Sequence, residues 1–259
     1  MLEGKNVNLT VVRMVRHEHR SNTSNLFLSF WESTTSEEVA RERARYVLRP
    51  IIEYHEQAKK ILELGCGLGE VLVNLPRRYT IYGLDIEKDC IDICEKKISE
   101  GKFFVSSMHD FKIDEKFDVI FSVYSFNFLK DLDQWKRTFE VVNEHLNRDG
   151  LFIFDAYTPK MLRDTLQSLK KHDSSTSSFR EFPKGYCYEN EIVKGDTRIL
   201  DTEIFERLPN GLYQLNKYRR KERIYPAAKM KSVLSVYFDI LRTNPREEGR
   251  KILFVCRKK

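Results

Sequence analysis

Apolar and polar residues alternate along residues 60–157 in a way that predicts strands and helices in turn. Short apolar runs indicate strands buried on both faces, and residues 117–123, apolar at nearly every position, are the clearest case. Between them, apolar residues recur every three to four positions, as on one face of a helix. The predicted order is strand 60–64, helix 69–75, strand 79–85, helix 88–97, strands 102–106 and 117–123, helix 131–146 and strand 151–154. Such alternation predicts a parallel sheet with right-handed connections.

The pattern changes after a helix predicted near residues 159–170. Residues 186–224 favour strands, separated by turns at residues 194–196 and 209–211. The second turn, Pro209-Asn210-Gly211, is typical of a β-hairpin. We therefore expect an antiparallel sheet inserted before two last strands of the main sheet, at residues 236–243 and 252–256.

The N-terminal part predicts a strand and a helix ahead of the main sheet. Residues 4–15 alternate loosely and indicate a short strand, and an aromatic-rich stretch follows at residues 26–31. Ser36 has the character of an N-cap, and Pro50 should kink the helix that follows or begin a second one. The chain thus divides into an N-terminal helical or capping segment (1–58), a main domain (59–170 and 225–259) and an inserted antiparallel region (171–224).

Composition bounds the class of protein. The 259 residues, 41% of them hydrophobic, suit one α/β domain with an elaboration. No run of 18 apolar residues occurs, and basic residues interrupt the N-terminal stretch, so we expect neither a membrane span nor a signal peptide. The five cysteines form no disulfide or zinc framework, so we expect no metal. A cytoplasmic protein is the expectation.

Positive charge is concentrated in the last fifth of the chain. The net charge is +6, and residues 210–259 hold 14 Lys and Arg against 4 Asp and Glu. The densest run, at residues 217–223, is interleaved with tyrosine and could contact phosphates and stack on bases. Such a run is more often the solvated face of a strand.

The most informative passage is residues 61–69, where an apolar run ends in Glu63 and three glycines, Gly65, Gly67 and Gly69. Glycine lets the backbone approach a ligand closely because it has no Cβ. Sixteen residues beyond Gly69, a second apolar stretch ends at Asp85. Strand, glycine loop, helix, strand and acid form the nucleotide-binding half of a doubly wound sheet. The G-x-G-x-G spacing differs from the G-x-G-x-x-G of dinucleotide folds, which disfavours an NAD-dependent reductase.

With Glu63 and Asp85 added to the glycines, the chain resembles the class I S-adenosylmethionine-dependent methyltransferases. The resemblance implies a doubly wound, mostly parallel, seven-stranded Rossmann-like α/β sheet whose last strand, residues 252–256, is reversed. The inserted antiparallel sheet is similar to that of the sugar amine N-methyltransferases and related small-molecule enzymes, where it would form a lid. The implied cofactor is S-adenosyl-L-methionine, with the Asp85 carboxylate accepting hydrogen bonds from the ribose hydroxyls.

The resemblance also implies a set of site residues. This family usually carries an acid that meets the adenine amino group where this chain has Ser107. Either Ser107 makes a weaker bond or Asp110 reaches in, and the backbone of Met108 could bond a ring nitrogen. The implied cofactor-binding residues are Glu63, Gly65, Cys66, Gly67, Gly69, Asp85, Ile86, Ser107, Met108, His109 and Ser122.

The acceptor side is less marked in the sequence. The segment after the fourth core strand suggests Tyr124 and Asn127, with the more distant Asp155 and Tyr157, as acceptor-pocket residues. Alternatively, Tyr124 simply covers the sheet edge and Asp155 caps the helix that starts near Pro159. Phe30 and Trp31 either line the site or pack against the first long helix. His109 and Tyr124 are the catalytic candidates, His109 because an imidazole suits proton transfer near neutral pH.

The predicted function is methyl transfer by in-line displacement to a small-molecule acceptor. The Asn-Pro-Pro-Tyr type motif of nucleobase and glutamine methyltransferases is absent after the fourth strand, which disfavours those acceptors. Two alternatives stay open, an RNA methyltransferase that uses the basic C-terminal segment and a non-catalytic homologue that binds the cofactor.

Overall fold

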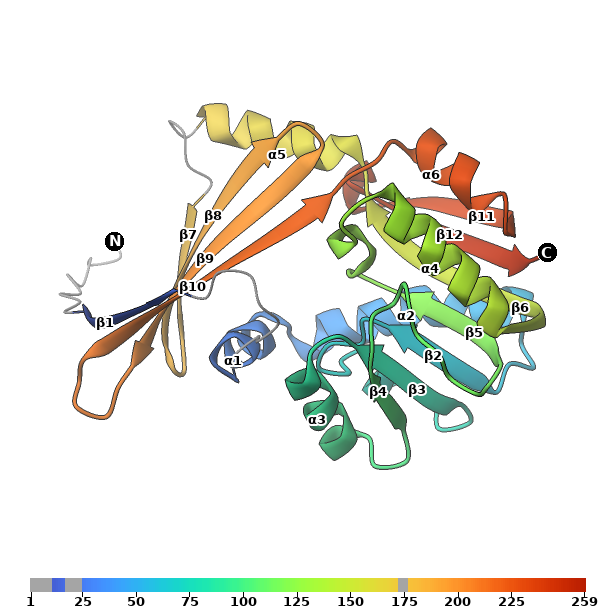
Figure 1. Ribbon diagram of the computed structural model, residues 1–259, viewed down its shortest axis with the longest axis horizontal. Helices are drawn as coiled ribbons and strands as arrows, with labels where there is room; N and C mark the ends of the chain where they lie inside the picture. Colours follow the sequence, from blue (N-terminus) through green and yellow to red (C-terminus); the bar gives the residue numbers. More distant parts are fainter. Residues whose placement is uncertain (1–10, 17–24, 172–176) are drawn as a thin grey trace.

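The computed structural model describes residues 11–16, 25–171 and 177–259, which form two β-sheets with helices around them (Figure 1). The main sheet has seven strands in the order β11-β12-β6-β5-β2-β3-β4. Its strands are β2 (Lys60–Leu64), β3 (Thr80–Asp85), β4 (Lys102–Val105), β5 (Phe117–Ser122), β6 (Leu146–Tyr157), β11 (Phe238–Arg246) and β12 (Lys251–Lys258). Only β12 runs against its neighbours. The predicted fold class is confirmed, including the reversed last strand.

Helices cover both faces of the main sheet. On one face lie α4 (Leu132–His145) and α6 (Ala227–Leu234), which bury Trp135, Phe139 and Met230 completely. On the other lie α2 (Glu37–Tyr54) and α3 (Lys88–Lys97). The predicted N-cap is confirmed, since Ser36 Oγ accepts a hydrogen bond from the backbone N–H of Val39. The sheet therefore lies between two apolar layers, as expected for strands that are apolar on both faces.

The insertion sheet has five strands in the order β1-β10-β9-β8-β7. They are β1 (Val11–Arg16), β7 (Ser177–Phe182), β8 (Gly185–Lys194), β9 (Thr197–Arg207) and β10 (Tyr213–Arg223). The four inserted strands are antiparallel as predicted, whereas β1 pairs in parallel with β10. This pairing joins the N-terminal part of the chain to the insertion and was not predicted.

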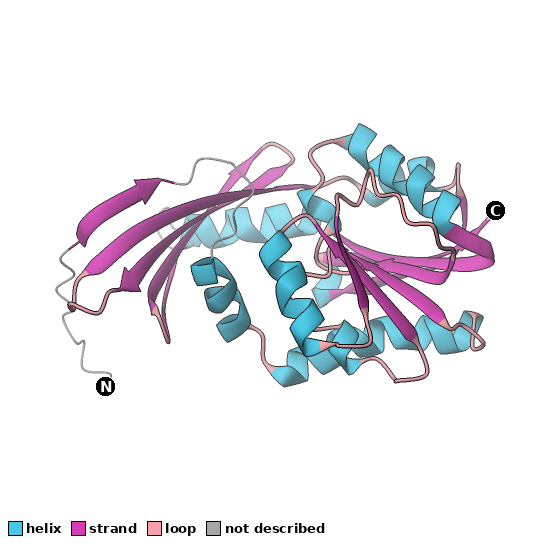
Figure 2. Ribbon diagram, turned by 60° about the horizontal axis from the view of Figure 1, so that its bottom comes forward, coloured by secondary structure: helices cyan, strands magenta, loops and turns pink. Residues whose placement is uncertain are grey.

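Helices α5 (Pro159–Lys171) and α1 (Asn25–Thr34) lie where the two sheets meet (Figures 1 and 2). Helix α1 packs against both. Phe27 and Phe30 contact residues of the insertion sheet, whereas Leu28 contacts Leu68 and Cys90 of the main domain. A short helix with two apolar faces thus connects the insertion to the main domain.

One local prediction is wrong, and one of two alternatives is excluded. The helix expected over residues 69–75 is only the 3₁₀ turn η1 (Leu72–Asn74). Pro76 explains this, because a proline disfavours the helical conformation of the residue before it, and Leu75 is extended with ψ 145°. Pro50 lies inside α2, which continues to Tyr54 as one helix, so no second helix begins there.

The topology places the candidate site at one edge of the main sheet. From β2 the chain continues to β3 and β4 on one side and returns to β5 and β6 on the other. The carboxyl ends of β2 and β5 therefore flank the switch point, where ligands bind in open α/β sheets. Each helix in the described part of the chain is too short or too polar to span a bilayer.

Candidate functional site

Three glycines leave parts of the loop after β2 without side chains. Gly65, Gly67 and Gly69 have φ values of +69°, +51° and +72°, a region that residues with side chains rarely adopt. A Cβ on Gly67 would meet no atom within 4 Å, whereas a Cβ on Gly65 would lie 2.7 Å from the Cβ of Ser125. Gly67 thus faces open space, and Gly65 permits close packing against the segment after β5.

Asp85, the last residue of β3, is tied to this loop. Its Oδ2 accepts a hydrogen bond from the backbone N–H of Gly67 at 2.9 Å, and its Oδ1 accepts one from Glu87 at 3.0 Å. Burial raises the pKa of Asp85, although these two N–H groups act in the opposite direction. Each carboxylate oxygen has a further lone pair, so the group can still accept hydrogen bonds from a diol.

Glu63 of β2 has a buried oxygen without a partner. The residue is 2% exposed, and among the described residues its Oε2 finds no hydrogen bond. Burial raises the pKa of Glu63 well above its ordinary value. Because an unpaired buried acceptor is costly, this carboxylate suits a ligand that brings a donor or a positive charge.

Arg43 of α2 reaches the same place and was not predicted. Its Nη1 lies 3.2 Å from Oε2 of Glu70, and its guanidinium carbon lies 4.1 Å from the centre of the Tyr124 ring. Helix α2 also contains Arg41, Arg45 and Arg49. Nothing in the sequence distinguishes Arg43 from them.

These groups line a cavity of about 470 Å³, within the usual size of a ligand pocket. Its walls come from the glycine loop, the segments after β3, β4 and β5, helix α1 and strand β10. The predicted cofactor-binding residues that line it are Glu63, Gly65, Cys66, Gly67, Asp85, Ile86, Ser107, Met108 and His109.

Gly69 and Ser122, also predicted to bind the cofactor, are not among the lining residues. Ser122 is completely buried, and its Oγ donates to the carbonyl oxygen of Leu64 at 2.9 Å. A Cβ on Gly69 would lie 3.1 Å from Sγ of Cys94. Ser122 thus lies behind the loop, and Gly69 is the part of the loop that packs against α3.

Two polar side chains after β4, Ser107 and His109, form a chain along the cavity wall with Gln134 of α4. Oε1 of Gln134 accepts from the backbone N–H of Lys130 at 2.7 Å, so its amide nitrogen is the atom 3.5 Å from Nε2 of His109. This arrangement assigns the imidazole proton to Nδ1, which lies 2.5 Å from Oγ of Ser107. Both ring nitrogens of His109 are thus engaged. Asp110, the alternative adenine partner, is not among the lining residues.

Tyr124, directly after β5, is held from several sides. Its φ is +62°, unusual for a residue with a side chain, and its backbone N–H donates to Oδ1 of Asp155 at 2.7 Å. Its hydroxyl donates to Oε1 of Glu247 at 2.7 Å. Burial raises the pKa of Tyr124, and the hydrogen bond to Glu247 adds to this. The phenol therefore stays protonated in the cavity wall.

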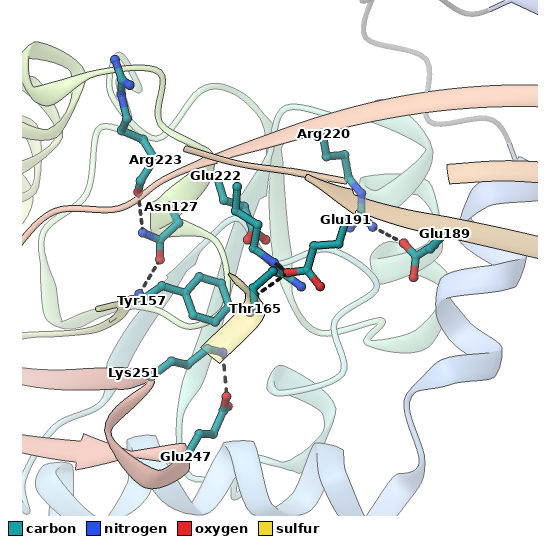
Figure 3. A network of polar contacts seen from close by, with 11 residues as sticks. Asn127, Tyr157, Thr165, Glu189, Glu191, Arg220, Glu222, Arg223, Glu247 and Lys251 are labelled. Atoms are coloured by element: carbon teal, nitrogen blue, oxygen red, sulfur yellow. Dashed lines mark hydrogen bonds and ion pairs between the residues drawn. The ribbon is translucent and has the colours of Figure 1, made fainter. Parts of the chain in front are cut away.

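A buried lysine lies behind Tyr124. Lys251 is 2% exposed, and its Nζ lies 2.8 Å from the centre of the Tyr124 ring, 3.4 Å from Glu247 and 3.8 Å from Asp155. Figure 3 shows Lys251 beside Glu247. Burial lowers the pKa of Lys251. This charged group supports Tyr124 and, like Arg43, was not predicted.

The other two acceptor-pocket candidates join the insertion to the main domain (Figure 3). Asn127 donates to the carbonyl oxygen of Arg223 on β10 and accepts from the backbone N–H of Tyr157 on β6, both at 2.7 Å. Arg198 of β9, paired with Glu222, lies 5.7 Å from the Tyr157 ring. Asn127 and Tyr157 therefore hold the two parts together and are not among the cavity-lining residues.

The insertion contributes one charged residue to the cavity wall, Arg220 of β10. Its guanidinium carbon lies 5.1 Å from the centre of the Phe27 ring and 5.2 Å from that of Trp31, both on α1 and both lining the cavity. Phe30, in contrast, packs against Phe182 of the insertion. Of the two aromatic residues weighed from the sequence, only Trp31 lines the cavity.

Metal ligands were not expected. Within the part of the chain that the structure places, no group of three or more His, Cys, Asp or Glu could hold a metal ion.

Comparisons with known proteins agree with this geometry. A family model described as a methyltransferase domain matches residues 61–150. A protein of Geobacillus sp. (strain WCH70) described as a methyltransferase is 24% identical over 82% of this chain and 90% of its own length. The malonyl-[acyl-carrier protein] O-methyltransferase of Bacillus anthracis is 26% identical over 62% of this chain and 64% of its own.

A solved structure shares the fold. The sugar N-methyltransferase KedS8 from Streptoalloteichus sp. ATCC 53650 superposes with a TM-score of 0.75, covers 99% of both chains and is 17% identical. The residues present also suit the cofactor. The unpaired oxygen of Glu63 can accept a hydrogen bond from its amino group, and the open space at Gly67 leaves room for its nucleoside. Residues 61–150 of this chain thus match a methyltransferase domain, and the chain has the fold of a known sugar N-methyltransferase.

Proposed function

We propose that the chain transfers the methyl group of S-adenosylmethionine to a small-molecule acceptor in the cavity between the glycine loop and the insertion sheet. One observation carries the proposal. Groups suited to the cofactor, such as Glu63 and Asp85, and residues of the insertion side, such as Arg220, line the same cavity. A cofactor at one end of this cavity and an acceptor at the other would therefore be in direct contact.

The cofactor would lie along the carboxyl ends of β2, β3 and β4. Asp85 would accept hydrogen bonds from the ribose hydroxyls. Glu63 would face the ammonium group and Arg43 the carboxylate of the methionine part, which offsets both charges. Ser107 and Met108, one strand further along the sheet edge, would contact the adenine.

When bound, S-adenosylmethionine supplies an electrophilic methyl group on a positively charged leaving group. The protein has to align a nucleophile about 3 Å from that methyl group, and alignment alone can supply much of the acceleration. Tyr124 is suited to this because its ring and backbone are fixed. Because its phenol stays protonated, Tyr124 would help to align the nucleophile with the methyl group and would not act as a base.

His109 fits a cofactor role better than that of a general base. Its two ring nitrogens face Ser107 and Gln134, which leaves no nitrogen for a proton of the acceptor. A base is needed only for acceptors that must lose a proton near the transition state.

Two observations support a small acceptor. The structural relative KedS8 is a sugar N-methyltransferase. In the basic run at residues 217–223, the three more exposed paired side chains form ion pairs within the insertion: Lys217 with Glu203, Arg219 with Asp201 and Arg223 with Asp196. Paired cations have less charge to offer to RNA phosphates.

The first experiment measures binding of S-adenosylhomocysteine by calorimetry, followed by transfer from radiolabelled S-adenosylmethionine to fractions of a metabolite extract. Asp85→Ala should weaken binding about tenfold or more, because two charge-assisted hydrogen bonds are lost. Asp133→Ala is the matched control, since Asp133 is exposed on α4. Wild-type affinity in Asp85→Ala would contradict the proposed site.

The same assay separates the alternatives. A non-catalytic homologue would bind S-adenosylhomocysteine without labelling any fraction. An RNA methyltransferase would label RNA and bind it less tightly as salt increases. Arg219→Glu with Lys221→Glu should then abolish labelling, whereas a small-molecule enzyme should keep its activity.

A further inference from the structure

Arg220 brings an incompletely satisfied cation to the acceptor side of the cavity. Its Nη2 donates to Oε1 of Glu189 at 2.8 Å, but its buried Nε has no hydrogen-bond partner among the residues that the structure describes. Glu189 also accepts from the Thr202 hydroxyl at 3.0 Å. A guanidinium has five N–H donors in a planar fork, so the pair with Glu189 leaves donors for a second anion.

The surroundings of Arg220 favour an oxygen anion. The Phe27 and Trp31 rings of α1 lie next to the guanidinium and shield it in part from water, so that the Arg220 side chain is 21% exposed. Shielding strengthens a charge-assisted bond to an anion, and a fork of donors matches the two oxygens of a carboxylate. The positive charge of the guanidinium also disfavours an acceptor that is itself positively charged, such as a protonated amine.

Among the described residues, the cavity wall near the acceptor offers no evident base. The carboxylates that line the cavity belong to β2 and β3 or to the segments after them, on the cofactor side: Glu63, Glu70, Asp85 and Glu87. The Tyr124 hydroxyl donates a hydrogen bond to Glu247, and His109 is engaged at both nitrogens. A nucleophile that is already deprotonated at neutral pH needs none of them, and a carboxylate is such a nucleophile.

We propose that the acceptor is a carboxylic acid, that Arg220 binds its carboxylate, and that the product is a methyl ester. One carboxylate oxygen forms the new bond to the methyl carbon, the carbon–sulfur bond breaks, and its electron pair stays on sulfur. The positive and negative charges cancel, and no proton moves. This inference rests on the proposed methyl transfer and adds the substrate class and the residue that selects it.

The test uses the chemical stability of the product. Wild-type protein is incubated with S-adenosylmethionine labelled in the methyl group and with a metabolite extract separated into acidic, neutral and basic fractions. Methyl esters release volatile labelled methanol in alkali, whereas methylated amines and ethers do not. We expect volatile label, formed from the acidic fraction.

Variants connect the product to Arg220. Arg220→Gln should lower the yield of volatile label about tenfold or more, because the charge is lost. Arg220→Lys should raise KM with less effect on kcat, because the charge remains without the fork. Arg219→Gln is the matched control, since Arg219 pairs with Asp201 at the neighbouring, more exposed position. Binding of S-adenosylhomocysteine is first measured for each variant. If Arg220→Gln does not bind it, the role of Arg220 is judged from the KM of Arg220→Lys.

The outcomes are distinguishable. Label that is stable in alkali would overturn the carboxylate acceptor and leave methyl transfer standing. Volatile label unaffected by either Arg220 substitution would overturn the role of Arg220. A protein that binds S-adenosylhomocysteine but labels no fraction would contradict the proposed function, and this inference with it.

Discussion

The backbone N–H of Gly67 donates a hydrogen bond to Oδ2 of Asp85 at 2.9 Å, which joins the glycine loop to the end of the next strand. The residue that leaves room for the ligand and the carboxylate expected to bind it are thus fixed relative to each other. This explains how a flexible residue can form part of a precise site.

Gly67 and Gly65 should respond differently to an added methyl group. In Gly67→Ala the new Cβ enters open space, so we expect a backbone cost of about 1 kcal/mol and a clear loss of S-adenosylhomocysteine affinity. In Gly65→Ala the new Cβ lies 2.7 Å from Ser125, so thermal stability should fall more. Thermal melts and calorimetry on both variants check this. Equal losses of stability would contradict the assignment of Gly67 to the cavity surface.

Glu63 should make the stability of the ligand-free protein depend on pH. Its pKa is raised in the folded state, so its contribution to stability is present at acidic pH and is lost as pH rises toward the raised value. Glu63→Gln removes this term, and its melting temperature should fall less than that of the wild type between about pH 5 and pH 9. Glu38→Gln, exposed on α2, should follow the wild-type curve.

Glu63→Gln should also bind S-adenosylhomocysteine less tightly, because the ligand's ammonium group loses a charged partner. Wild-type affinity together with an unchanged pH dependence would show that Glu63 is paired in a way the cavity geometry does not indicate.

Trp31 should report ligand binding directly. The chain has two tryptophans, and Trp31 lines the cavity whereas Trp135, on α4, is completely buried. Binding of S-adenosylhomocysteine should change the fluorescence of the wild type, and Trp31→Phe should abolish the change with affinity measured separately by calorimetry. A signal that persists in Trp31→Phe would mean that the ligand does not reach α1.

Lys251 should be important for stability because it is buried among charges. Lys251→Met leaves the Asp155 and Glu247 carboxylates without their cation, and a loss of about 3–5 kcal/mol in the free energy of unfolding is expected. Urea denaturation measures it. Arg41→Met, which removes an exposed pair with Glu37, should cost less than about 1 kcal/mol.

Adding Asp155→Asn to Lys251→Met should restore part of that stability. An asparagine can still accept the Tyr124 N–H, and one uncompensated charge is removed. Strictly additive losses in the double variant would mean that Lys251 and Asp155 do not interact.

The sequence by itself determined the main sheet and the glycine loop. Strands such as β5 are apolar throughout, and the residues from Glu63 to Gly69 are adjacent in the chain, so local patterns were enough to place them. One local prediction failed, the helix after Gly69, because the effect of Pro76 on Leu75 was not weighed.

Only the tertiary structure decided which distant side chains meet at the cavity. Arg43, Arg220 and Lys251 lie in basic stretches where each looks like a surface residue, and β1 gave no sign that it would pair with β10. Their positions depend on how α2, β10 and β12 pack against the glycine loop and Tyr124. Periodicity reports which face of an element is buried, but not which element covers it, and so it cannot identify the charges that a fold encloses.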